Sequence, residues 1–160
     1  MIVGWTGHRP ELFRDPLAAS ARVEAAARDL VAREPVDGFL VGGQRGVDTW
    51  AALAAIALDV PFTLLLPLDV GQFTLDWAPS DRSLLEQTIA RAAEVRVAGS
   101  YTERNRQIAT RADLLVAVWT RIAHGGTAET VDLARAAGTP IREILLDAAA
   151  AAGSAEGRGV

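Results

Sequence analysis

The sequence predicts a doubly wound α/β fold, in which a mostly parallel β-sheet is covered by helices on both faces. Two observations predict it. Short, continuously apolar segments alternate along the chain with longer amphipathic segments, and apolar strands separated by helices are typical of a parallel sheet that is buried on both sides. Turn-forming residues follow most of the apolar segments, which places loops where each strand passes into a helix.

Six apolar segments are expected to form the strands. The first, MIVGWTG, ends at Gly7, and the second, DGFLVGG, ends at Gly42 and Gly43. The segment VRVA is short and is expected to be a minor strand. The expected strands are residues 1–7, 37–43, 61–68, 95–98, 113–119 and 139–146.

The segments between these strands carry helical periodicity and residues typical of helix ends. Ser20 is expected to be the N-cap of the first helix, and Ser80, which follows Pro79, the N-cap of the third. Gly138 is expected to end the last helix in the left-handed conformation. The expected helices are residues 20–34, 47–59, 78–94, 102–112 and 125–138.

A chain of 160 residues, half of them hydrophobic, is long enough for one compact domain. We expect a single domain at residues 1–146 and a low-complexity tail at residues 147–160. The irregular stretch 69–79 is long for a helix–strand connection, and loops of that length are often lids or binding loops. The sequence leaves open whether residues 67–80 close over a ligand.

Composition narrows the classes of function. The net charge of −4 argues against general binding to nucleic acid, although a local basic patch remains compatible with it. The chain has no cysteine, and its histidines are His8 and His124, so we expect no metal site and no bound cofactor. Neither a signal peptide nor a membrane span is recognisable, so we expect a soluble, cytoplasmic protein with no membrane partner.

Two glycine-rich turns follow strands and lead into helices: GGQRG at residues 42–46 and HGGTAET at residues 124–130. In doubly wound sheets, ligands bind beyond the carboxyl ends of the strands. Unpaired N–H groups and the helix dipole make each turn a candidate anion site, and Thr127 could add a hydroxyl donor. Together with the arginines nearby, the two turns predict a small phosphate-containing, nucleotide-like ligand.

Several side chains at these positions have a functional and a structural interpretation. Arg45 could clamp a phosphate or form a surface ion pair, and Asp48 could bind a ribose hydroxyl, hold Arg45 or complement the helix dipole. His8 could contact the ligand or belong to the core. Trp5 and Trp119 could stack on a base or pack in the core. The expected ligand-binding residues are Gly7, His8, Arg9, Gly42, Gly43, Arg45, Gly46, Asp48, Arg104, Asn105, Gly125, Gly126 and Thr127.

Three segments, GGQRGVDTWAA, RNRQIATRADLLVAVW and GGTAETVDLARAAGTPI, resemble the SLOG superfamily, which includes the DNA-processing protein DprA (Smf) and the LOG phosphoribohydrolases. With TGHRP, they look closest to its small stand-alone YpsA/YspA-like branch. The resemblance extends from residue 2 to about residue 146, and it implies a Rossmann-like fold. It also implies pairing into a homodimer, which relatives often form.

The resemblance implies three alternative functions. We expect binding of a nucleotide or nucleotide-derived phosphate ligand, as in a sensor. The second alternative is LOG-like hydrolysis of nucleoside 5′-monophosphates to release the free base, with Arg104 and Glu129 as catalytic residues. The third is DprA-like binding of single-stranded DNA. The LOG pattern is not fully kept, since Asn105 replaces its lysine and Thr130 stands at its glutamate, with Glu129 one residue earlier. On a helix, one residue is a rotation of about 100°.

Overall fold

The computed structural model describes residues 1–150 of the chain. Six strands form one sheet in the order β4-β3-β2-β1-β5-β6, and every neighbouring pair is parallel. The strands are β1 (Ile2–Gly7), β2 (Gly38–Val41), β3 (Phe62–Leu66), β4 (Glu94–Val97), β5 (Leu114–Trp119) and β6 (Ile141–Leu145). The helices are η1 (Pro10–Leu12), α1 (Pro16–Arg33), α2 (Val47–Ala57), α3 (Val70–Phe73), α4 (Pro79–Arg91), α5 (Tyr101–Arg111) and α6 (Gly126–Ala137).

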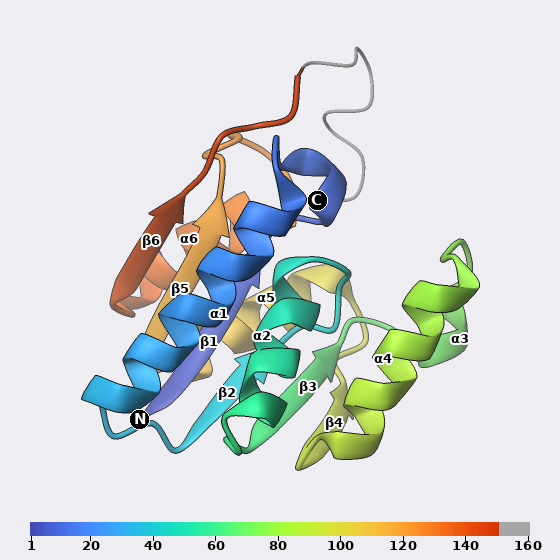
Figure 1. Cartoon of the computed structure of the whole chain (residues 1–160), viewed down its shortest axis with the longest axis horizontal. Helices are drawn as coiled ribbons and strands as arrows, with labels where there is room; N and C mark the ends of the chain where they lie inside the picture. Colours follow the sequence, from blue (N-terminus) through green and yellow to red (C-terminus); the bar gives the residue numbers. More distant parts are fainter. Residues whose placement is uncertain (151–160) are drawn as a thin grey trace.

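The sheet is the middle of three layers, with α1, α2 and α4 on one face and α5 and α6 on the other (Figure 1). Alternate residues of each strand point to opposite faces. Val3 and Trp5 therefore join the core beneath α1 and α2. Leu65 and Leu115 pack on the other face, against residues of α5 and α6 such as Ile108. The predicted doubly wound α/β fold is confirmed.

Two predicted helix N-caps were wrong. Helix α1 begins at Pro16, and its N-cap is Asp15, whose carboxylate accepts a hydrogen bond from the Ala18 N–H. Ser20 therefore lies inside the helix. Helix α4 begins at Pro79 itself, without a side-chain cap. Proline is favoured in the first helical turn, where its missing N–H costs nothing, so both helices start earlier than the serines suggested.

The last helix ends as predicted, and the irregular loop contains structure that was not predicted. Gly138 has φ 75° and ψ 14°, the left-handed conformation that closes α6. Within the stretch 69–79, residues Val70–Phe73 form the short helix α3, capped by Asp69.

The tail expected at residues 147–160 lies outside the described residues from position 151 onwards. Before that point, the chain is attached to the segment around η1. The Arg14 N–H donates to the Asp147 carbonyl, and the Ala149 N–H donates to the Leu12 carbonyl, each at 2.9 Å. In the described part of the chain, no helix combines the length and apolar character needed to cross a membrane.

The order in which the chain adds strands to the sheet reverses between β1 and β5. From β1 the chain builds outward through β2 and β3 to β4, and α5 then carries it back to β5 on the other side of β1 (Figure 1). The loops after β1 and β5 therefore diverge, and a crevice forms at their carboxyl ends. This switch point is where ligands bind in open α/β sheets.

Candidate functional site

A cavity of about 730 Å³ lies at the carboxyl edge of the sheet, in the range typical of small-molecule sites. Loops from both sides of the switch point line it, so residues far apart in sequence meet there. The lining residues that carry the argument are Thr6 and Gly7 after β1, Arg45 and Asp48 after β2, Phe73 and Trp77 after β3, Tyr101, Arg104 and Asn105 on α5, and Gly126, Thr127 and Glu129 on α6.

The N-terminus of α6 opens into this cavity without a side-chain cap. Its N-cap is Gly125, at φ 97°, and no side chain accepts a hydrogen bond there. The first-turn N–H groups of a helix have no partner inside the helix. Thr127 is only 2% exposed and lines the cavity, yet its hydroxyl makes no hydrogen bond within residues 1–150. This end of α6 therefore offers donors to an anion.

At the other glycine turn, residues 42–46, several N–H groups already have partners. The Gln44 N–H donates to Asp48 Oδ2 at 3.1 Å, and the Arg45 N–H donates to the side chain of Gln44 at 2.9 Å. The Val47 N–H, which begins α2, donates to the His8 carbonyl at 3.2 Å. The Asp48 carboxylate thus takes the place that an external anion would occupy. Part of this predicted anion site is therefore already occupied by groups of the protein itself.

The glycines of this turn are needed for packing. A Cβ atom on Gly46 would lie 2.4 Å from the His8 carbonyl oxygen, and one on Gly42 would lie 2.3 Å from a terminal nitrogen of Arg104. Gly43 has φ 79°, which favours glycine. The structure does not place Gly42, Gly43 or Gly46 among the residues that line the cavity.

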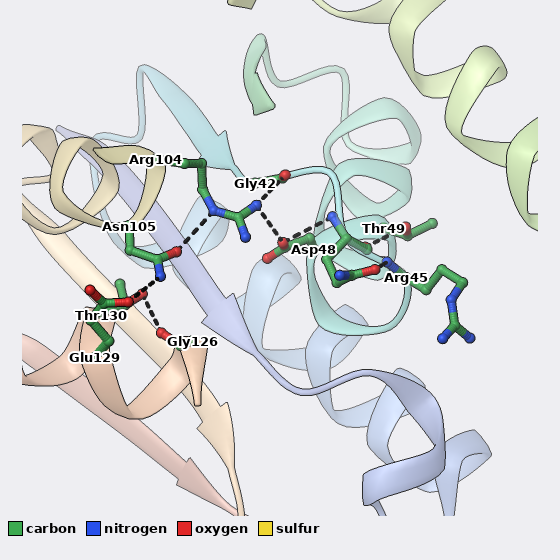
Figure 2. Close-up of polar contacts among 10 residues, drawn as sticks. Gly42, Arg45, Asp48, Thr49, Arg104, Asn105, Gly126, Glu129 and Thr130 are labelled. Carbon is green, nitrogen blue, oxygen red and sulfur yellow. Dashed lines mark hydrogen bonds and ion pairs between the residues drawn. The ribbon is translucent and has the colours of Figure 1, made fainter. Parts of the chain in front are cut away.

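Arg104 and Asp48 form a buried pair on the cavity floor (Figure 2). Arg104 Nη1 lies 3.9 Å from Asp48 Oδ2 and donates to the Gly42 carbonyl, while its Nε donates to Asn105 Oδ1 at 2.9 Å. Nη2 makes no hydrogen bond within residues 1–150. Burial raises the pKa of Asp48 to about 6, and the nearby Arg104 limits that rise. Burial lowers the pKa of Arg104.

Asn105 holds Glu129 at the cavity. Its side-chain amide donates to Glu129 Oε2 at 3.0 Å (Figure 2), and Glu129 lines the cavity. Thr130, which stands at the position of the LOG glutamate, is buried and donates to the Gly126 carbonyl at 2.7 Å. The carboxylate one residue early in the sequence therefore reaches the site.

The remaining arginines have partners of their own. Arg45 donates to both carboxylate oxygens of Glu11, at 2.8 and 3.3 Å, and Figure 2 shows its side chain directed away from Asp48. The ion-pair interpretation of Arg45 therefore describes the structure, and Asp48 holds Arg104 instead. Arg9 lies 3.5 Å from the same Glu11. Arg106 is exposed and pairs with Glu103.

His8 lies behind the cavity, in the core. It is fully buried, and its Nε2 accepts a hydrogen bond from the Thr120 N–H at 3.1 Å. Burial lowers the pKa of His8 to about 4, so the ring is neutral at neutral pH. The structure does not place His8 among the cavity-lining residues.

Sequence reasoning missed the aromatic side of the cavity. Trp5 and Trp119, the two candidates for stacking, are buried in the core. Phe73, Trp77 and Tyr101 line the cavity instead. The available signal was the long loop 69–79, which already marked a binding loop. Thr6 was also missed: it is 7% exposed, lines the cavity, and its hydroxyl makes no hydrogen bond within residues 1–150.

No protein-family model matches the sequence, and no curated protein does. Among solved structures, DNA-processing protein A (DprA) from Streptococcus pneumoniae is similar, with a TM-score of 0.65 and 17% identity over 88% of this chain and 49% of that one. The same protein from Helicobacter pylori, described for its binding of single-stranded DNA, is also similar. Its TM-score is 0.63 and its sequence identity is 17%, over 89% of this chain and 64% of that one.

A third solved structure, TM1055, gives a TM-score of 0.59 and 18% identity over 88% of this chain and 71% of its own. The fold is shared. At these identities the likeness extends to the fold alone, and this chain spans less than two thirds of either DprA protein. The Rossmann-like fold implied by the resemblance to the SLOG superfamily is confirmed.

Proposed function

We propose that this protein binds a nucleotide or a nucleotide-derived phosphate ligand at the cavity, as a sensor would, and that it belongs to the SLOG superfamily. One observation carries the proposal: the uncapped N-terminus of α6 opens into a cavity that Thr6 and Thr127 also line, and the hydroxyl groups of these two residues make no hydrogen bond within residues 1–150. Several donors that face one cavity and have no partner within residues 1–150 favour a ligand that supplies acceptors.

In this proposal the phosphate accepts hydrogen bonds from the first-turn N–H groups of α6 and from the Thr127 hydroxyl. Thr6 adds a hydroxyl from the end of β1, and Arg104 Nη2 adds a charged donor from the floor. Asp48 Oδ2 is occupied by Gln44 and Arg104, so Oδ1 is the atom that would accept a ribose hydroxyl. Glycine at positions 125 and 126 lets a phosphate approach the backbone closely.

Thermal unfolding with a panel of nucleoside monophosphates, NAD, ADP-ribose and a short single-stranded oligonucleotide tests the proposal. A ligand at roughly 100 times its Kd should raise the midpoint by roughly 5–10 °C. Thr127→Val should reduce that rise, because it removes one of the proposed phosphate donors at nearly constant volume. Thr110→Val is the matched control, since Thr110 is exposed on α5 and donates to the Arg106 carbonyl. A panel without any shift would contradict the proposal.

Hydrolysis of a nucleoside monophosphate is the second candidate, and the Asn105–Glu129 hydrogen bond favours it. A carboxylate that stabilises developing positive charge on a sugar must be held in place, and Asn105 holds Glu129 at the cavity wall. Arg104 would then steer the phosphate or the leaving group. Chromatographic detection of free base, present with the wild type and absent with Glu129→Gln, would establish hydrolysis. Binding without base release would leave the sensor function.

Binding of single-stranded DNA is the alternative that the similarity to DprA from Helicobacter pylori brings forward. It predicts a steep fall in affinity with salt, because such binding releases counterions from phosphates. If only the oligonucleotide raises the unfolding midpoint, and added salt removes that rise, binding of single-stranded DNA would replace mononucleotide binding as the proposed function. We also propose a homodimer, which light scattering measures directly.

A further inference from the structure

We propose that Phe73, Trp77 and Tyr101 form an aromatic wall that seats the planar base of the ligand. The ligand then lies across the cavity, with its base at this wall and its phosphate at the N-terminus of α6. This inference rests on the proposed function and adds the orientation of the ligand and the residues that select it.

The three rings belong to one cluster that borders the cavity. The ring centroids of Phe73 and Trp77 are 4.9 Å apart, and those of Phe73 and Tyr101 are 6.2 Å apart. Phe73 is 4% exposed and packs on Leu66 and Leu85 in the core. The wall is therefore anchored through Phe73, while Trp77 and Tyr101 carry its accessible surface.

The wall leaves aromatic surface uncovered inside a cavity. Tyr101 is 46% exposed and Trp77 is half-buried, although both line the cavity. Single exposed apolar residues are common on protein surfaces. Adjacent aromatic residues on one wall, facing a polar wall, form the arrangement expected of a ligand site. Stacking on such side chains is the usual way in which proteins hold a base.

Charge sets the direction of the ligand. The segment after β3, residues 67–79, contains two aspartates and no basic residue, and Asp76 lines the cavity. From this segment, a phosphate would meet a carboxylate and no cation. At the opposite side, the open N–H groups and the positive end of the α6 dipole favour an anion. A nucleotide therefore gains most when its base lies toward α3 and its phosphate toward α6.

Arg104 connects the two sides. Its guanidinium carbon lies 5.7 Å from the centroid of the Tyr101 ring, at a distance where a cation attracts an aromatic face. The hydrogen bonds to Gly42 and Asn105 fix the guanidinium. Tyr101 thus packs beside a fixed group, which holds the aromatic wall in a constant position relative to the cavity floor.

The test compares a nucleoside 5′-monophosphate with ribose 5-phosphate, which has the same phosphate end and no base. Both are titrated by calorimetry against the wild type, Trp77→Leu and Tyr101→Ala. The wild type should bind the mononucleotide about 10- to 100-fold more tightly than ribose 5-phosphate, as expected from base stacking. Each wall variant should lose most of that difference while it keeps its affinity for ribose 5-phosphate.

Controls separate the possible failures. Retained ribose 5-phosphate binding shows that a wall variant is folded. The matched control is Trp50→Phe, because the Trp50 ring packs beside Phe13 against the core under α1 and α2. This variant should bind both ligands like the wild type. Equal wild-type affinity for the two ligands, or wall variants that bind the mononucleotide like the wild type, would overturn the aromatic wall and leave the phosphate site intact. Absence of binding to either ligand would overturn the proposed function itself, and the wall with it.

Discussion

Replacing Asp48 by asparagine should change how the stability of the protein depends on pH. In the folded protein, burial raises the pKa of this carboxyl group from its ordinary value of 3.8 to about 6. The folded state therefore binds a proton that the unfolded state releases. The stabilisation is complete below the unfolded pKa and is lost as the pH rises through the folded pKa.

The size of the effect follows from the shift. Each pKa unit corresponds to about 1.4 kcal/mol, so the wild type should lose roughly 3 kcal/mol through Asp48 between about pH 4 and about pH 6. His8 acts in the same range with the opposite sign, because burial lowers its pKa from 6.5 to about 4. The stabilisation that His8 contributes is complete above its pKa of 6.5 in the unfolded state. It falls by roughly 3 kcal/mol as the pH drops to about 4.

The two titrations nearly cancel in the wild type, and Asp48→Asn removes one of them. In the variant, the free energy of unfolding should fall by roughly 3 kcal/mol more than in the wild type on acidification from about pH 6.5 to about pH 4. Urea unfolding followed by tryptophan fluorescence at several pH values measures both curves. Titratable groups that both proteins contain contribute equally to the two curves, so their effect cancels when one curve is subtracted from the other. Parallel pH curves for the two proteins would refute the assigned cost of burying Asp48.

Two further changes test the packing of the site and the start of α1. Gly42→Ala should destabilise the protein by about 1–3 kcal/mol, because the new methyl group would lie 2.3 Å from the hydrogen-bonded Arg104, whereas Gly71→Ala, with its nearest neighbour at 3.4 Å, should not. Equal melting temperatures for the two would contradict the close contact. Asp15→Ala should cost about 1 kcal/mol through loss of the helix cap, and Ser20→Ala should change stability by less than about 0.5 kcal/mol. Denaturant midpoints that fall for Ser20→Ala instead would restore the cap first predicted.

The sheet could be predicted from the sequence because its central strands, β1, β2, β3 and β5, are apolar runs of suitable length between turn residues. The helix starts were less predictable. Ser20 and Ser80 are good caps by residue type, but the first-turn prolines, Pro16 and Pro79, begin the helices earlier. Where two nearby positions both fit the preferences for a helix start, the local sequence does not tell at which of them the helix begins.

The site could be predicted in its location and only partly in its residues. The turns at 42–46 and 125–127 look alike in sequence, and the difference between them arises from partners that fold onto the first turn. The His8 carbonyl accepts a hydrogen bond from the Val47 N–H, and the Asp48 carboxylate accepts one from the Gln44 N–H. The aromatic residues were misassigned for a related reason: side chains alternate along a strand, so Trp5 faces the opposite side of the sheet from the cavity-lining Thr6.

The arginines around the cavity are each accompanied by a carboxylate, Arg45 by Glu11 and Arg104 by Asp48. An approaching anion therefore meets little net positive field, and long-range attraction contributes little to its rate of association. We expect that rate to change only weakly with ionic strength. The lifetime of the complex then depends on short-range hydrogen bonds and on fit. The proposed ligand would then be selected by shape among the many phosphorylated metabolites of a cell, rather than by its negative charge alone.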